Sequence, residues 1–207
     1  MSDPDQKPAR GRPRKMSSDA VLDVAMNAYW DNDPVDVSVN AICQMADVSK
    51  PSIYRTFGSE DGLTSAALAR YAEQVLSDVF AILQSGADMP TVLDALVDFA
   101  CADPRMETGC LFNKMRAGKH RLGPDTRARV DEIGAAALAG YADFLQARRD
   151  AGEWAGPISV EAGAQYLSEQ IALAFTQRGS GVDPDNIRNM LGLALSVLRQ
   201  QPTETPD

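Results

Sequence analysis

The sequence predicts an all-α protein of about nine helices, with a small three-helix unit at the N-terminal end and a larger helical body behind it. Three observations lead to this fold class. Apolar residues recur at helical spacing in most segments, no segment alternates with the period of two that a half-buried strand requires, and Gly, Pro and Asn separate the periodic segments. At 207 residues and 44% apolar composition, the chain can bury a core of ordinary size.

The N-terminal unit is expected between residues 17 and 57, where short helices follow residues that can cap them. A serine side chain at a helix start accepts a hydrogen bond from a free backbone N–H group. The three helices are predicted to begin at Ser17 or Ser18, at Ser38 and at Ser49. The first ends before Pro34 and the third runs through Phe57.

Six further helices are predicted in the body, the first of them unusually long. They cover residues 60–84, 90–102, 110–117, 124–151, 159–177 and 183–199. The domain organisation that we expect is therefore a disordered basic arm at 1–16, a three-helix domain at 17–62, a helical body at 63–201 and a tail at 202–207.

Charge is distributed unevenly along the chain. The net charge is −9, yet residues 7–15 carry +5, so the rest of the chain carries −14. Such a protein can approach nucleic acid only with its acidic body turned away from phosphate. We expect Arg12, Arg14 and Lys15 to contact DNA. Residues 10–14 resemble an AT-hook core, which lies in the minor groove; the alternative is a solvated tail that only adds positive charge.

Several classes of function find no support in the sequence. Three separated cysteines and a single His120 cannot form a zinc site of the usual spacing. There is no Gly-rich phosphate loop, no metal-binding helix motif and no nucleophile motif. We therefore expect no catalytic residues, no metal and no cofactor. With no apolar run near 20 residues and no secretory signal, we expect a cytoplasmic protein that is not held in a membrane.

The stretch from Ser38 to Leu63 is the most informative part of the chain. It describes two short helices joined by a tight turn, with Ile42 and Ala46 of the first facing Ile53 of the second. Asp47 stands where the turn needs a left-handed backbone.

The opposite face of the second helix is short, rigid and rich in hydrogen-bond donors. Such a helix fits the major groove, where Arg55 can reach guanine while Lys50, Tyr54 and Thr56 reach phosphate. The predicted DNA contacts of this unit are Ser38, Ser49, Lys50, Pro51, Ser52, Tyr54, Arg55 and Thr56.

Residues 46–57, ADVSKPSIYRTF, followed by Ser59 and Leu63, resemble the helix-turn-helix signature of the TetR family of transcriptional regulators. The resemblance is specific over about residues 17–65. It implies a homodimer that binds double-stranded operator DNA, with repression released by an unidentified small-molecule effector. Asp47, Thr56 and Glu60 replace the usual glycine, histidine and phosphate-contacting lysine, so that lysine contact is not carried over. The alternative is a helical adaptor that binds protein and not DNA.

In the body, large side chains could line an effector pocket between helices. The candidates are Phe80, Phe99, Cys110, Phe112, Met115, Tyr141, Phe144 and Tyr166. Cys110 follows Gly109 at a predicted helix start, which could lower its thiol pKa and permit redox sensing. A basic segment at 114–129 could face DNA, pair with acids or receive an anionic ligand.

The last two helices are apolar on more than one side, which predicts a partner. We expect them to pair with the same helices of a second subunit about a two-fold axis. The predicted interface residues are Leu167, Ile171, Ile187, Leu191, Ala194 and Leu198.

Overall fold

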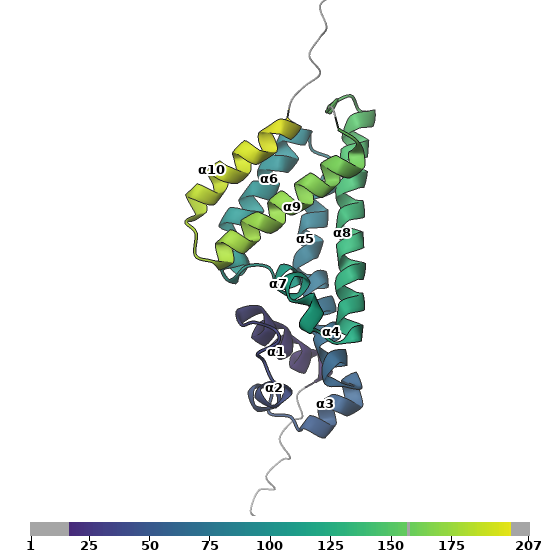
Figure 1. The fold of residues 1–207 in the computed structure, drawn as a ribbon, viewed down its shortest axis with the longest axis vertical. Helices are drawn as coiled ribbons and strands as arrows, with labels where there is room; N and C mark the ends of the chain where they lie inside the picture. The colour runs from purple at the N-terminus through teal and green to yellow at the C-terminus, as the bar shows by residue number, and fades with distance from the viewer. Residues whose placement is uncertain (1–16, 157, 200–207) are drawn as a thin grey trace, which may run out of the picture.

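A computed structural model describes residues 17–156 and 158–199, and all regular structure within those ranges is helical (Figure 1). The helix-turn-helix unit forms one end of the molecule, and α8, α9, α10 and α6 form the other. A single apolar core runs through both parts. The all-α fold predicted from the sequence is confirmed.

The helix-turn-helix unit consists of α1 (Ser18–Asp31), α2 (Val39–Met45) and α3 (Lys50–Phe57). The hydroxyl of Ser17 accepts a hydrogen bond from the N–H of Ala20, and that of Ser38 accepts one from Ala41, both at 3.2 Å. These caps satisfy donors that the first turn of a helix leaves free. These caps explain why α1 and α2 begin at the positions that were predicted from the serine residues.

The turn between α2 and α3 depends on Asp47, which has a positive φ of 48°. Ala46 and Ile42 are fully buried on one side of the turn and Ile53 on the other, so the two helices pack through small and branched side chains. The left-handed backbone predicted at Asp47 is present.

A long helix then leads from the helix-turn-helix unit into the body. It consists of α4 (Glu60–Tyr71), a π-helical turn (Ala72–Leu76) and α5 (Ser77–Leu83), and the chain turns at Gly86 with φ 76°. The sequence predicted the length of this helix and not its π turn. A π turn accommodates one extra residue, so the side chains after it face a different direction from those before it.

The body is completed by α6 (Met89–Ala102), α7 (Leu111–Ala117), α8 (Pro124–Asp150), α9 (Val160–Gly179) and α10 (Pro184–Leu195). Short 3₁₀ turns lie at Pro104–Thr108, Lys119–Arg121 and Ser196–Leu198. If α4, the π turn and α5 count as one helix, the described residues contain nine helices, as predicted. In Figure 1, α8 runs along one side of the body while α9 and α10 cross the other.

Trp30 joins α1 to the body. Its indole N–H donates to the carbonyl of Gly109 at 2.6 Å, and its ring meets the edge of Tyr71, with 4.7 Å between centroids. The Lys114 ammonium group donates to the Trp30 carbonyl. The helix-turn-helix unit is therefore attached to the body by buried contacts as well as by the continuous helix.

The residues predicted to form the dimer interface lie inside the monomer instead. Five of them are at most 4% exposed: Leu167, Ile171, Ile187, Leu191 and Leu198. They fill the space between α6, α9 and α10, so they have almost no surface left to offer a partner. Ala194 is only partly exposed, and its carbonyl accepts a hydrogen bond from the hydroxyl of Tyr166. Burial within the single chain does not support these residues as an interface, which stays a prediction.

In the part of the chain that the structure describes, none of the helices combines the length and the apolar character needed to cross a membrane.

Candidate nucleic-acid interface

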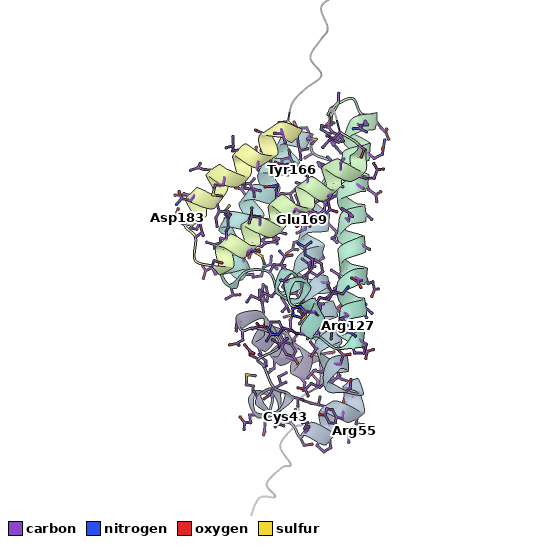
Figure 2. The ribbon with its side chains drawn as sticks, viewed as in Figure 1. Cys43, Arg55, Arg127, Tyr166, Glu169 and Asp183 are labelled. Carbon is purple, nitrogen blue, oxygen red and sulfur yellow. The ribbon has the colours of Figure 1, made fainter. Side chains whose placement is uncertain are left out.

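Helix α3 presents one buried and one open side. Ile53 is 1% exposed and anchors the helix against α2 and α4, whereas Pro51, Tyr54, Arg55 and Thr56 are exposed. Figure 2 shows Arg55 at the outer end of the molecule, far from Tyr166 on α9. The eight predicted contacts of the unit, from Ser38 to Thr56, are all exposed or partly exposed.

Neighbouring side chains hold this open side in place. The Lys50 ammonium lies 5.5 Å from the centre of the Tyr54 ring, a distance at which cation and ring attract each other. Arg55 donates to the Ser52 hydroxyl at 3.2 Å, and the Thr56 hydroxyl donates to the Ser52 carbonyl at 3.0 Å. The guanidinium retains further donors for a base edge.

The N-terminus of α3 offers one free backbone donor. Ser49 is the N-cap residue, yet its side chain makes no capping hydrogen bond, unlike those of Ser17 and Ser38. Pro51 has no N–H, and the N–H of Ser52 donates to the Ser49 carbonyl at 2.8 Å. The N–H of Lys50 is therefore the donor left for a phosphate oxygen, which the positive end of the helix dipole also attracts.

Glu60 has a structural role that the sequence did not reveal. Its carboxylate accepts a hydrogen bond from the N–H of Val39, the first residue of α2, at 3.2 Å. The acid thus supports the start of α2 and also lies at the start of its own helix, where negative charge is favourable. This contact gives a physical reason for an acid at a position where the resembling family has a lysine.

Positive charge is scarce on the unit itself. Between residues 17 and 62 the only bases are Lys50 and Arg55, against eight acids. The remaining basic residues expected at DNA, Arg12, Arg14 and Lys15, lie outside the described residues.

The basic segment at 114–129 is engaged within the chain. Arg116 pairs with Glu169 at 3.0 Å, Arg129 with Glu132 at 2.6 Å, and Arg121 with Asp33 at 3.3 Å. Lys119 pairs with Asp131, while Lys114 and Arg127 donate to backbone carbonyls. Of the three interpretations that the sequence left open, pairing with acids and backbone accounts for every lysine and arginine of the segment.

A cavity of about 50 Å³ lies between α5, α7, α8 and α9. Four of the predicted pocket residues line it: Phe80, Cys110, Phe112 and Tyr141. Four others lie elsewhere. Phe99 packs against Phe175, Phe144 borders a separate groove, Met115 is buried in the core, and Tyr166 bonds to α10.

The environment of Cys110 opposes a reactive thiol. Its side chain is 2% exposed, and burial raises its pKa above the ordinary value of 9.0. The lowered pKa predicted from its place at a helix start is wrong, because loss of solvation outweighs the nearby backbone donors.

Comparison with known proteins agrees with this geometry. Residues 21–67 match the family model described as "Bacterial regulatory proteins, tetR family". The HTH-type transcriptional repressor ComR of Escherichia coli (strain K12) is 30% identical over 96 residues, which are 46% of this chain and 45% of ComR. The match therefore spans about half the length of this curated relative.

Solved structures share the whole fold. The reduced form of E. coli NemR superposes with a TM-score of 0.78 at 19% identity, over 88% of this chain and 97% of NemR. A CifR cysteine mutant, described as a TetR family transcriptional regulator complexed with 26-base-pair operator DNA, gives 0.74 at 22% identity, over 90% and 98%.

The outward α3, its seat on α2 and α4 and the helical body define a helix-turn-helix protein of the regulator class. The matched N-terminal segment carries the likeness in sequence: residues 21–67 are similar to the tetR family of bacterial regulatory proteins, and the solved structures share the fold of the rest.

Proposed function

We propose that this protein is a sequence-specific DNA-binding transcription regulator that places α3 in the major groove of operator DNA. The observation that carries the proposal is the open side of α3, which is held rigidly by the burial of Ile53 and carries hydrogen-bond donors at its exposed positions. We also propose a cytoplasmic regulator without enzymatic activity, which the match of residues 21–67 to the tetR family model supports.

The contacts divide into reading and positioning. Arg55 binds the O6 and N7 atoms of a guanine, because its guanidinium is a planar fork at an exposed position. Lys50, Tyr54 and Thr56 bind phosphate, together with the start of α3 at Ser49. The remaining proposed contacts are Ser38, Pro51 and Ser52 of the unit and Arg12, Arg14 and Lys15 of the arm.

A homodimer would provide two such helices. The outer face of α9 and α10 exposes four large apolar side chains, Leu173, Met190, Leu193 and Val197. Met190 and Leu193 on α10 and Val197 in the 3₁₀ turn that follows it are spaced by three and four residues, which places them on one stripe. At Gly192, beside this stripe, an added Cβ would meet nothing within 4 Å in the monomer. A partner helix could approach closely there, and we place the two-fold interface on this face.

The body between residues 63 and 201 would receive an effector, in a domain separate from the helix-turn-helix at 17–62. The cavity lined by Phe80, Phe112 and Tyr141 is the candidate site, because it is mainly apolar and touches four helices. At about 50 Å³ it must widen to hold a ligand. A ligand that prefers the widened body would shift the equilibrium away from the DNA-binding arrangement, which is release of a repressor.

The base-reading role of Arg55 gives the direct test. The duplex is the palindrome that the wild-type protein selects from a random-sequence library. Arg55→Ala should weaken binding to it by about 1–3 kcal/mol and relax the preference at one position. Arg199→Ala is the matched control, since Arg199 pairs with Asp94 on the body, away from α3. Equal loss on selected and random duplexes would overturn the reading role, and no binding by the wild type would overturn the proposed function.

A further inference from the structure

Two adjacent acids at the start of α4 each bind the N-terminus of another helix. Glu60 accepts a hydrogen bond from the first residue of α2, inside the helix-turn-helix unit. Asp61 accepts hydrogen bonds from the first residues of α8, in the body. The first turn of α4 is therefore a second place, besides Trp30, where side chains join the reading unit to the body, and it is the place where the chain itself passes between them.

The Asp61 carboxylate uses both of its oxygens. Oδ2 accepts from the N–H of Asp125 at 2.7 Å, while Oδ1 accepts from the N–H of Thr126 at 3.1 Å and from its hydroxyl at 2.6 Å. Thr126 is 0% exposed, and its hydroxyl also lies 3.2 Å from the backbone carbonyl of Asp61, so both of its acceptors belong to Asp61 and the carboxylate is the nearer one. A carboxylate at this position acts as the cap of α8, although it comes from a residue 64 positions earlier.

Gly123, the N-cap residue of α8, makes room for this contact. A Cβ atom built there would lie 2.2 Å from Cγ of Asp61 and within 2.5 Å of both its oxygens. Any other residue would therefore push the carboxylate away. Gly123 has no side chain that could cap α8, and the Asp61 carboxylate accepts the hydrogen bonds that a capping side chain would accept.

Helix α8 connects this contact with the cavity of the body. Ala137 and Tyr141, farther along α8, line the cavity, and the first turn of α8 rests on Asp61. A second interaction close by joins the helix-turn-helix unit to the body through ion pairs of Arg121 with Asp33 and Asp36. These ion pairs are weaker because all three side chains are exposed. Trp30 ties α1 to Gly109 and α7, whereas Asp61 holds the unit on α8 itself, so the angle between the unit and α8 depends on Asp61.

We infer that Asp61, Gly123, Asp125 and Thr126 form a capping latch that fixes the helix-turn-helix unit at one angle on α8. In the homodimer this angle sets the separation of the two α3 helices, and therefore the spacing of half-sites that the protein accepts. Asp61 is a positioning residue that has no DNA contact of its own. The inference rests on the proposed function, since only a dimeric DNA reader has a spacing to set.

The experiment varies the operator spacing. The probes are the selected palindrome, versions with one or two base pairs inserted between or deleted from its half-sites, and a single half-site. Wild-type affinity should fall steeply when the half-site spacing changes, because two rigidly held α3 helices fit only one separation of the half-sites. Asp61→Ala should bind the selected palindrome roughly tenfold more weakly, a loss of about 1.4 kcal/mol, and should lose much of its dependence on spacing. Its affinity for the half-site should remain that of the wild type.

Two further changes test the latch without altering Asp61. Gly123→Ala should reproduce the flattened spacing profile by displacing the carboxylate, and Thr126→Val should do so in part. Asp61→Asn should restore part of the profile, because its amide oxygen still accepts a hydrogen bond. The matched control is Asp88→Ala, which removes a cap within the body, where Asp88 accepts from the N–H of Thr91 at 2.9 Å.

The outcomes separate the two proposals. A latch variant that is less stable to heat yet keeps the wild-type spacing profile would overturn the latch and leave the proposed function standing. The latch would also be overturned, with the proposed function again intact, if Asp88→Ala flattened the profile as much as Asp61→Ala. Failure of the wild type to bind any selected duplex would overturn both.

Discussion

Burial keeps two side chains of the body, Cys110 and Tyr141, neutral up to a higher pH than usual because it raises the pKa of each. Cys110 is the N-cap residue of α7 and meets Phe112 and Tyr141 at the cavity. Burial raises the pKa of its thiol and of the Tyr141 hydroxyl, since neither anion can be solvated there. These groups link the stability of the fold to alkaline pH.

The expected consequence is a loss of stability at high pH. The folded-state pKa of Cys110 lies above its unfolded value of 9.0, so the thiol contributes fully below pH 9. Above pH 9 the unfolded chain ionises first and the free energy of unfolding falls. Urea unfolding from pH 7 to pH 10.5 should show this decline, and Cys110→Ala should reduce its slope. An unchanged slope in the variant would assign the decline to the buried tyrosines alone.

Asp47 gives a second prediction for a single residue. Its φ of 48° is tolerated by Asp less well than by Gly. Asp47→Ala should lower the free energy of unfolding by about 1 kcal/mol, whereas Asp47→Gly should match or exceed the wild type. Thermal unfolding of the two variants side by side checks the order, and an alanine variant as stable as the glycine variant would contradict it.

Residues with local partners could be predicted from the sequence, and those with distant partners could not. The serine caps, the inward Ile53 and the outward Arg55 follow from spacing within a few positions. Asp61 reads as an ordinary acid in a first helical turn, and nothing in its neighbourhood indicates Thr126. The roles of such residues appear only when the chain is folded.

Helix boundaries were predicted closely for the same reason. Caps, Pro and Gly act within one turn, so most of the predicted ends lie within a few residues of the observed ones. The π turn at Ala72–Leu76 leaves no such local signal.

The close approach of α9 to the chain at Thr108 and Gly109 gives a prediction at the scale of the element. A Cβ added to Gly179 on α9 would lie 3.0 Å from Cα of Gly109 and from the carbonyl oxygen of Thr108. These are backbone atoms that cannot rotate away, so Gly179→Ala should destabilise the fold by about 1–3 kcal/mol. Gly118→Ala is the control, because its added atom meets only the Lys114 carbonyl oxygen at 3.5 Å. Denaturant unfolding of both variants tests the contrast, and equal stabilities would refute it.

At the scale of the whole molecule, the sequence predicts that α9 and α10 need a partner, and the structure shows that α6 and the rest of the body cover the apolar stripe that the prediction assigned to a second subunit. Both helices are apolar nearly all round, and periodicity alone does not say which stripe faces α6. The structure assigns Leu191 and Leu198 to the core and leaves Leu193 75% exposed.

The exposure of Leu193 predicts how the proposed dimer responds to a charge placed at that residue. Leu193→Glu should yield a folded monomer with greatly weakened operator binding, because a monomer has one α3 helix and makes half of the DNA contacts of a dimer. Sedimentation and circular dichroism measure the two properties together. Ile158→Glu is the control, since Ile158 is an exposed apolar side chain outside the α9–α10 stripe. A Leu193→Glu protein that remains dimeric would remove this face from the interface.

The scarcity of bases on the helix-turn-helix unit makes a prediction about salt. Residues 7–15 carry +5, while the unit at 17–62 carries Lys50 and Arg55 against eight acids. Removing residues 1–15 should weaken binding to all duplexes and flatten the dependence of log affinity on log salt concentration. Fluorescence anisotropy at several salt concentrations measures the slope, and an equal slope would leave the arm without phosphate contacts.

The π turn in the long helix has a consequence for how this chain can change in length. One residue added to or removed from α4 or α5 rotates everything beyond it by roughly 100°, which would carry buried side chains into solvent. Between Ala72 and Leu76 the helix already holds one surplus residue, and Glu73 there is exposed. Loss of a single codon at this point would convert the turn to regular α-helix and leave both flanking faces aligned. The π turn is thus the place in this helix where evolution can delete a residue at little cost.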